Sequence, residues 1–414
     1  MTIGDELLLG FTIDTNGAHL ARELAQVGIT VSRRTSVGDG ASEIAAAVRE
    51  ALDRSGAVIT TGGLGPTSDD MTKPAIAGIF GRAMRLDESI VERLRLRWKS
   101  RGWPGELPES NKQQAQIPDG ATILENQHGS APGIWLEDER GRWVAMLPGV
   151  PREMRGMLAD VLLPRLVSQV DGVPTVVASR TIRTTGISES ALSDRIRNLA
   201  ALDFEGLSLA YLPGWEGVDL RLTSSGLTAE DAAARFARVG GALTAAAADH
   251  VYGGGSDDLA TTVLDALRDA RQTIAVAESC TGGMLGMRLT AIAGSSDVVL
   301  GGVIAYHNDV KVQQLGVRPQ TLQDHGAVSE ETAREMAGGA RALLGSSVGV
   351  GITGIAGPGG GTPDKPVGTV CVAVDLEGDV RSFRASMVGD RHEIRQRGAQ
   401  AALNLVRRMM AGMA

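Results

Sequence analysis

Apolar and polar residues alternate with two different periods in the N-terminal part of the chain. Hydrophobic side chains recur every three or four positions over residues 14–27 and 42–55, which predicts two amphipathic helices. Short apolar runs at 31–37, 57–60 and 143–146 have the length that is typical of strands. Because strands and helices follow one another in this order, the pattern predicts a parallel sheet with helices packed on its faces.

The pattern changes over residues 168–252, which have the texture of a small α+β module. Strands are expected at 175–184 and 220–223, and helices at 188–199 and 228–247. A Gly-rich run follows the second helix and has the composition of a linker. This module therefore separates two longer regions.

The last region, residues 253–414, returns to the alternation of strand and helix. Strand-like runs occur at 273–278, 298–306 and 347–352, with helical stretches between them. We therefore predict an α/β chain. Two three-layer domains with parallel sheets, residues 1–167 and 253–414, are expected to flank the α+β module.

Composition narrows the classes of function. The chain has 414 residues, which at about 150 residues per domain predicts two or three domains. A net charge of -8 and an aromatic content of 3% argue against nucleic-acid binding. Two cysteines make neither a disulfide framework nor a zinc motif. We expect a cytoplasmic protein without membrane contact, because no apolar run is long enough to span a bilayer and no signal peptide is visible.

The strand predicted at 273–278 runs directly into the sequence Glu-Ser-Cys-Thr-Gly-Gly. A Gly-rich turn between a strand and a helix exposes backbone N–H groups, and the start of a helix favours negative charge. Ser279 and Cys280 therefore stand where a nucleophile or an anion-binding hydroxyl would be useful. A tight turn in which Ser or Thr caps the helix explains the same sequence equally well.

Two further strand ends supply candidates for the same site. Ser279, Tyr306 and Thr353 each fall at the end of a predicted parallel strand, so neighbouring strands would bring them to one sheet edge. Lys311 lies in the first turn of the helix that follows Tyr306, and a lysine can act as a base when its pKa is lowered. Each residue alone has a plain structural explanation. Their joint placement favours a catalytic site.

Backbone amides on the two Gly-rich loops of this region offer an oxyanion hole, and an arginine before the last helix can hold a phosphate. The candidate substrate-binding residues are Cys280, Thr281, Gly282, Gly283, Gly354, Ile355, Ala356, Gly357 and Arg391.

The N-terminal region has its own candidate loop at residues 62–70. Its glycines would let the backbone approach a phosphate, and two adjacent carboxylates, Asp69 and Asp70, precede a helix. These carboxylates can hold Mg²⁺ or simply complement the helix dipole. The candidate substrate-binding residues here are Gly62, Gly63, Thr67 and Lys73.

Further carboxylates follow strand-like segments of this region. Asp5, Glu6 and Asp39 are expected at the same sheet edge as the loop. We therefore predict a divalent metal ion, Mg²⁺ or similar, in this domain. The candidate ligands are Glu6, Asp39, Asp69 and Asp70.

Motifs of the first region match the pattern of the CinA family in order. They lie at residues 3–8, 14–16, 38–39, 61–72, 129–133 and 147–151. The region resembles the molybdopterin-binding, MoaB/MogA-like fold, and the resemblance implies a metal-dependent ADP-ribose pyrophosphatase in which the metal and Lys73 offset developing charge. The chain departs from the family in two ways: its first strand is nearly absent, and Ser130 replaces a threonine.

The last region resembles the C-terminal domain of the same family, whose stand-alone members are nicotinamide mononucleotide (NMN) deamidases. Its motifs lie at 277–283, 294–296, 306–308, 311, 325–329, 354–358, 365–369 and 389–391. The resemblance implies that Ser279 is the nucleophile, that Lys311 and Tyr306 activate it, that Thr353 and backbone amides stabilise the oxyanion, and that no cofactor is needed. Cys280 is the competing nucleophile, because thiolates are intrinsically more reactive.

The middle module resembles the KH-like insert of full-length CinA proteins and leaves a second hypothesis open. In it, the chain is a binding protein associated with competence or DNA damage, with degenerate catalytic domains. The acidic charge and scarce aromatics count against nucleic acid as the partner. The expected partners are therefore NMN and ADP-ribose, together with further copies of the chain.

Overall fold

A computed structural model describes residues 1–169, 175–197, 199, 204 and 206–413. These residues form two compact units. The first comprises Met1–Ala178 and Ser225–Ala232, and the second comprises Ser179–Ser224 and Ala233–Ala414.

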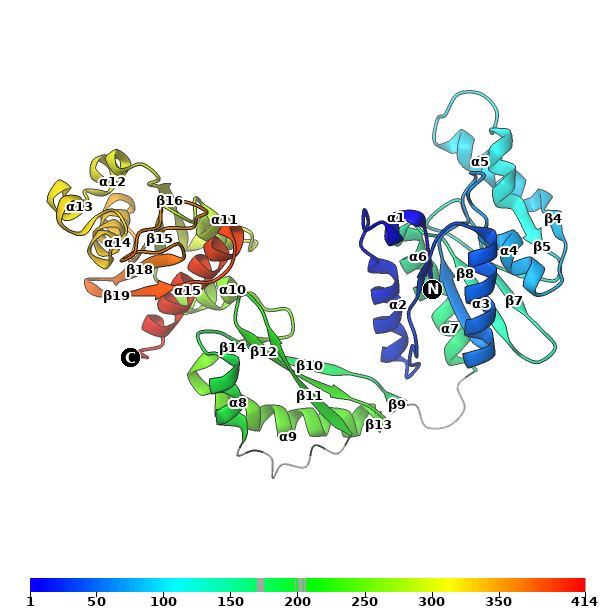
Figure 1. Ribbon diagram of the computed structural model, residues 1–414, viewed down its shortest axis with the longest axis horizontal. Helices are drawn as coiled ribbons and strands as arrows, with labels where there is room; N and C mark the ends of the chain where they lie inside the picture. Colours follow the sequence, from blue (N-terminus) through cyan, green and yellow to red (C-terminus); the bar gives the residue numbers. More distant parts are fainter. Residues whose placement is uncertain (170–174, 198, 200–203, 205, 414) are drawn as a thin grey trace. The chain divides into compact units, whose positions relative to one another are not determined.

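The first unit is built on a six-stranded mixed sheet in the order β2-β1-β3-β8-β7-β6 (Figure 1). The first four of these strands are parallel, and β7 and β6 are antiparallel to their neighbours. The strands are β1 (Thr2–Ile3), β2 (Ser36–Val37), β3 (Ala57–Thr61), β6 (Thr122–Leu124), β7 (Gly133–Glu137) and β8 (Trp143–Leu147).

Helices cover both faces of this sheet and give the three layers that the sequence predicts. Ile44, Ile76 and Ile90 place α3, α4 and α5 over one core, while Leu20 and Met154 place α2 and α6 over a second core. The helices are α1 (Asp5–Leu8), α2 (Thr15–Gln26), α3 (Ala41–Ser55), α4 (Thr72–Ile79), α5 (Glu88–Ser100), α6 (Pro151–Met157) and α7 (Leu163–Val167). Two small antiparallel pairs complete the unit: β4 (Met84–Leu86) with β5 (Gln116–Pro118), and β9 (Thr175–Val176) with β13 (Leu227–Thr228).

The strand predicted at 31–37 is only partly present. It forms only at β2, because β2 pairs with β1 alone and β1 has just two residues. The nearly absent first strand therefore lies in the interior of the sheet, between β2 and β3. The amino group of Met1 is buried there and donates to the carbonyl oxygen of Ile59 at 2.8 Å. A missing parallel partner shortens the neighbouring strand.

The second unit contains a five-stranded sheet in the order β16-β15-β17-β18-β19. The first three strands are parallel, and β18 and β19 add an antiparallel side that the sequence pattern did not predict. The strands are β15 (Ile274–Glu278), β16 (Val299–Ile304), β17 (Val348–Gly354), β18 (Thr369–Leu376) and β19 (Asp379–Ser386).

Helices again pack on both faces of this sheet (Figure 1). Leu264, Leu285 and Leu403 bring α10, α11 and α15 onto one face, and Leu315 and Met336 bring α12 and α14 onto the other. The helices are α10 (Leu259–Ala270), α11 (Met284–Thr290), α12 (Asn308–Leu315), α13 (Pro319–His325), α14 (Glu330–Leu344) and α15 (Arg391–Met410).

The middle of the chain forms a four-stranded antiparallel sheet in the order β11-β12-β10-β14. Its elements are β10 (Ser179–Thr184), α8 (Glu189–Arg197), β11 (Leu207–Pro213), β12 (Val218–Ser224), α9 (Ala229–Ala247) and β14 (Val251–Gly254). The predicted helix at 188–199 corresponds to α8, and its residue 198 lies outside the described residues. Residues 170–174, near the predicted domain boundary at 167/168, also lie outside them.

The predicted α/β fold class is confirmed by these mixed, partly parallel sheets with helices on both faces. Across the described parts of the chain, no helix is both long enough and apolar enough to cross a membrane.

Candidate active site

Three neighbouring parallel strands end at one edge of the second unit's sheet. Glu278 at the end of β15 lies opposite Ile304 of β16 and Ile352 of β17. The residues that follow these positions therefore lie side by side, as the sequence predicts for Ser279, Tyr306 and Thr353. They line a pocket of about 210 Å³ together with Lys311 and Arg391.

Lys311 and Ser279 form a buried pair in this pocket. The Nζ atom of Lys311 lies 3.2 Å from Ser279 Oγ, and the lysine is 1% exposed. Nζ also donates to the carbonyl oxygens of Ala305, at 2.8 Å, and Tyr306, at 3.5 Å. Burial lowers the pKa of Lys311, with an opposing contribution from neighbouring Cys280. A neutral amine with its two hydrogens on these carbonyls would direct its lone pair towards the serine hydroxyl.

Cys280 lies beside the serine and is buried, at 6% exposed. Burial raises the pKa of its thiol to about 12. The reactive form of a cysteine is the thiolate, which is therefore scarce here at neutral pH. This electrostatic environment favours Ser279 over Cys280 as the nucleophile.

Tyr306 is largely exposed, and its hydroxyl contacts the cation at the start of α15. Arg391 Nη2 lies 3.1 Å from the Tyr306 hydroxyl, and Nη1 donates to the carbonyl of Gly357 at 2.6 Å. Asp390 caps α15 in a capping box with Glu393. This cap fixes where the helix starts, and Arg391 is its first residue. Tyr306 therefore positions Arg391 in this structure. The activation of Ser279 by Tyr306, which the resemblance implies, stays a prediction.

Thr353 is buried, and its hydroxyl donates to the carbonyl of Ala327 at 2.7 Å. The single hydroxyl proton is thus already used, so Thr353 lines the pocket without offering a donor to an oxyanion. Asn308 also lines the pocket, although the sequence analysis did not select it. The signals for it were the 306–308 motif and its position at the start of a helix, two residues after Tyr306.

Several candidate oxyanion amides already have partners. The N–H of Gly282 donates to the carbonyl of Ser279, that of Gly283 to Glu278, and that of Ile355 to Thr369. Gly354 belongs to the β17–β18 ladder. The remaining candidates are the amides of Cys280 and Thr281, which also face the Cys280 sulfur, and those of Ala356 and Gly357.

Glu278 was missed by the sequence analysis. Its carboxylate is 1% exposed and accepts from the N–H groups of Gly283 at 3.0 Å, Leu285 at 3.1 Å and Gly286 at 2.8 Å. It therefore supplies the negative charge that the start of α11 favours. An acidic residue just before a Gly-rich helix start was the available signal. This helix end consequently does not serve as the phosphate site.

Carboxylates gather at the corresponding edge of the first unit. The backbone N–H of Asp5 donates to Asp39 at 3.0 Å, and the N–H of Asp39 donates to Asp5 at 3.1 Å. Burial raises the pKa of Asp39, and the nearby charges of Asp5, Glu6 and Asp69 act in the same direction. Within the described ranges, however, no three acidic, His or Cys side chains form a group that could hold a metal ion. The predicted ligands thus do not form a ready-made metal site.

The loop at 62–70 and Lys73 are organised internally. Asp70 accepts from the backbone N–H groups of Gly65, at 2.7 Å, and Thr67, at 2.8 Å. Lys73 is 1% exposed and donates to the carbonyl oxygens of Gln113 and Gln114 at 2.6 and 3.2 Å. Burial lowers the pKa of Lys73 to about 8. Asp70 therefore shapes the loop, and the lysine ammonium is held by carbonyls.

Gly62 and Gly63 shape the start of this loop. Both have positive φ, and a Cβ atom on Gly62 would lie 2.2 Å from the carbonyl oxygen of Ile3. Only glycine fits this approach of the loop to β1.

Three family profiles match the chain. They are the CinA C-terminal domain over residues 256–410, the "Probable molybdopterin binding domain" over 1–168, and the damage-inducible protein CinA KH domain over 179–253.

The chain is also similar to whole proteins. It is 61% identical to the CinA-like protein of Gemmatimonas aurantiaca, over 99% of this chain and 96% of that protein. It is 43% identical to the CinA-like protein of Salinibacter ruber, over 99% and 98%. Among solved structures, it is 42% identical to the competence/damage inducible protein CihA from Agrobacterium tumefaciens, over 36% of this chain and 90% of that chain, with a TM-score of 0.35.

Proposed function

This chain belongs to the CinA family, and we propose on that premise that its last domain is an amidohydrolase acting on NMN. The products are nicotinate mononucleotide and ammonia, a reaction of pyridine nucleotide salvage. The observation that carries the proposal is the buried pair of Ser279 and Lys311, 3.2 Å apart, with the lysine pKa lowered by burial. A serine with an adjacent amine base is an established arrangement for acyl transfer.

The chemistry follows from this pair. Neutral Lys311 takes the hydroxyl proton as Ser279 Oγ attacks the carboxamide carbon, and the carbonyl oxygen becomes an oxyanion. Lys311 then gives the proton to the departing NH₂ group, which leaves as ammonia, and an ester to Ser279 remains. Water, activated by the same lysine, hydrolyses the ester to the carboxylic acid. The reaction consumes one water and needs no cofactor.

The oxyanion of this reaction needs N–H donors near the serine. The backbone amides of Cys280 and Thr281 follow the nucleophile directly, and Ala356 lies on the facing loop and lines the pocket. Fixed backbone amides stabilise developing negative charge effectively because they need no reorganisation. We assign the oxyanion to these amides rather than to the Thr353 hydroxyl.

Arg391 is the candidate for the phosphate of the nucleotide. It lines the pocket and is oriented by Tyr306 and the carbonyl of Gly357. Guanidinium groups bind phosphate through directed, charge-assisted hydrogen bonds. This assignment predicts that the enzyme prefers the nucleotide over the nucleoside.

The test is incubation of the full chain with NMN and, separately, with nicotinamide riboside, followed by mass identification of the products. We expect nicotinate mononucleotide and ammonia from NMN, and turnover of the riboside at least about 10-fold lower because the Arg391 contact is lost. Release of free nicotinamide, or no consumption of NMN, would refute the proposal.

A second activity is proposed for the first domain: hydrolysis of the pyrophosphate of ADP-ribose, dependent on a divalent cation. The supporting observation is the raised pKa of Asp39 among Asp5, Glu6 and Asp69, which marks an accumulation of negative charge at the sheet edge. Because these carboxylates do not form a group that could hold an ion, cation dependence must be measured directly. AMP release from ADP-ribose should require added Mg²⁺ and stop with chelator. Release that ignores the chelator would remove the metal from the proposal.

A further inference from the structure

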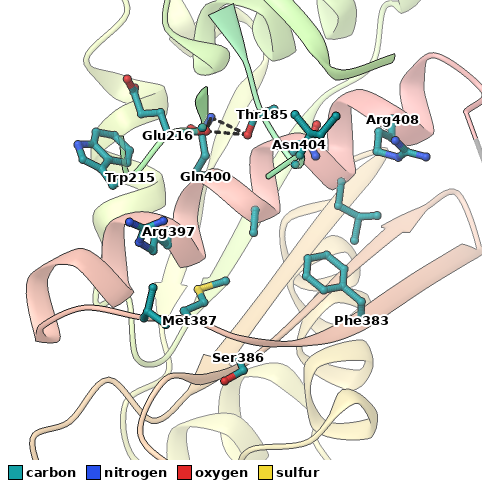
Figure 2. A pocket seen from close by; sticks show the side chains of 16 residues that line it. Thr185, Trp215, Glu216, Phe383, Ser386, Met387, Arg397, Gln400, Asn404 and Arg408 are labelled. Carbon is teal, nitrogen blue, oxygen red and sulfur yellow. Dashed lines mark hydrogen bonds between the residues drawn. The ribbon is translucent and has the colours of Figure 1, made fainter. Parts of the chain in front are cut away.

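A cleft lies between α15 and the middle module, within the second unit (Figure 2). We name it the α15 cleft and define it by Thr185, Trp215, Phe383, Met387, Arg397 and Asn404. Its volume is about 520 Å³, within the range of roughly 300–1,000 Å³ that is typical of small-molecule sites. None of these residues belongs to the amidase pocket described above.

The wall of the cleft is fixed by a buried hydrogen-bond network. Gln400 is 3% exposed, and its Nε2 donates to Thr185 Oγ1 at 3.2 Å and to the carbonyl of Glu216 at 3.0 Å. Its Oε1 accepts from Arg288 Nη1 at 2.8 Å. One of the dashed lines in Figure 2 marks the hydrogen bond between Gln400 and Thr185. Because the network satisfies both ends of the Gln400 carboxamide, this wall of the cleft is held in place.

The one carboxylate that lines the cleft is already neutralised. Glu216 forms an ion pair with Arg183, and Arg288 lies 3.8 Å from it. Asn404 accepts from Arg407 through its side-chain oxygen, at 3.2 and 3.0 Å, so its NH₂ group faces away from that arginine. The polar side chains that remain available to a ligand are therefore mainly hydrogen-bond donors.

Arg397 is the principal cation of the cleft. Other arginines of α15 are engaged: Arg391 donates to Gly357 and Arg395 donates to Thr281. The side chain of Arg397, by contrast, makes no hydrogen bond or ion pair with the part of the chain that the structure describes, and its Nε is buried without a partner. A guanidinium in a cleft, held by no protein acceptor, favours an anion such as phosphate or carboxylate.

Aromatic and apolar side chains form the rest of the lining. Trp215 and Phe383 contribute rings, and Met387 contributes a thioether that adapts to planar groups. The guanidinium of Arg288 lies 5.2 Å from the centre of the Trp215 ring and holds that ring in place. Such a lining favours a planar ring over a bare inorganic anion.

We propose that the α15 cleft is a second ligand site, which binds a nucleoside monophosphate with its base against Trp215 and its phosphate on Arg397. Arg408 also lines the cleft but stands 11 positions further along α15. That separation is about 16 Å along a helix at 1.5 Å per residue, beyond the reach of one phosphate already bound at Arg397. The assignment is independent of the amidase reaction.

The test uses the full chain labelled with 5-fluorotryptophan, whose five tryptophans give five fluorine NMR resonances. Trp215→Phe assigns the reporter. AMP is the probe, because it carries a base and a phosphate but no carboxamide. We expect AMP to shift the Trp215 resonance saturably, and adenosine or inorganic phosphate alone to do so at much higher concentration.

Arg397→Gln should raise the AMP concentration at half-saturation by at least about 10-fold, since a charge-assisted contact is lost. Arg271→Gln is the matched control: it removes one positive charge at the end of α10, outside the cleft, and should titrate as the wild type. If Arg397→Gln loses its fold, seen in the other four resonances, Arg397→Lys replaces it and should weaken binding. An unshifted Trp215 resonance at millimolar AMP, or an Arg397→Gln variant that titrates as the wild type, would overturn the proposal.

Discussion

Lys311 acquires its chemistry from burial. The residue is 1% exposed, and transferring its ammonium group out of water disfavours the charged form, so the pKa of Lys311 is lowered. Only the neutral amine can accept the proton of Ser279. Burying a charged lysine destabilises the fold. The same burial favours the neutral amine, which is the form that can act as the proposed base.

The lowered pKa of Lys311 predicts how NMN hydrolysis depends on pH. NMN hydrolysis should be fast at a pH above the pKa of Lys311 and should slow as the pH falls through that pKa, because protonation removes the lone pair of the lysine Nζ. Lys311→Arg should lower kcat by at least about 100-fold at every pH, since arginine stays protonated. The measurement is kcat against pH for both proteins. A variant with an unchanged pH profile would exclude Lys311 as the base.

Lys73 makes a prediction about stability instead. Burial lowers its pKa to about 8 from the usual 10.5, so the unfolded chain binds more protons between these values. The free energy of unfolding should therefore rise with pH from about 8 to 10.5, by at most roughly 3 kcal/mol. Denaturant unfolding of the wild type and Lys73→Met over this window tests the point. The variant should lack the rise; an identical slope in both proteins would mean that Lys73 titrates normally.

At the residue scale, the sequence located the pair that we propose as catalytic, but not the contacts around it. Ser279 and Lys311 were placed correctly next to each other by strand ends and helix turns, which are local features. The partners of Thr353 and Tyr306 were not predicted, because Ala327 and Arg391 approach from distant segments. Such contacts depend on tertiary packing, which no local pattern encodes.

At the scale of elements, pairing partners decide how long a strand is. Residues 31–37 have a strand-like sequence, yet only Ser36–Val37 is a strand, because β1 offers two residues to pair with. The alternation of strands and helices in the sequence predicted the parallel strands of both sheets. The antiparallel β18 and β19 did not, since a short apolar run does not reveal its direction.

The start of α11 depends on a single carboxylate. Glu278 accepts three backbone N–H groups in a buried position, so replacing one oxygen by NH₂ places donors against donors. Glu278→Gln should lower the free energy of unfolding by about 2 kcal/mol and displace the Ser279 turn, which reduces NMN hydrolysis. Thermal unfolding and activity of the same preparation test this prediction.

The matched control is Glu393→Gln, which changes an exposed capping-box carboxylate at the start of α15. This substitution should lower the free energy of unfolding by no more than about 1 kcal/mol. If both variants lost the same amount of unfolding free energy, the burial of Glu278 would add nothing to the effect of an ordinary helix cap.

At the scale of the whole molecule, both α/β domains gather their candidate residues at the carboxyl edge of the parallel side of a mixed sheet. In the last domain, that edge holds the hydroxyl of Ser279 and the buried amine of Lys311. In the first domain, it holds several carboxylates. The shared position explains why strand order predicted both places, while the chemistry had to be argued from individual side chains. The two edges belong to different units, so the proposed amidase should work without the carboxylates.

The measurement that tests this account most directly is ammonia release from NMN by four full-length proteins: the wild type, Ser279→Ala, Cys280→Ala and Asp39→Asn. We predict that Ser279→Ala lowers the rate by at least about 1,000-fold. Cys280→Ala should keep most of the activity because its buried thiol is protonated, and Asp39→Asn should match the wild type because it belongs to the other unit. Loss of activity in Cys280→Ala together with retention in Ser279→Ala would contradict the account.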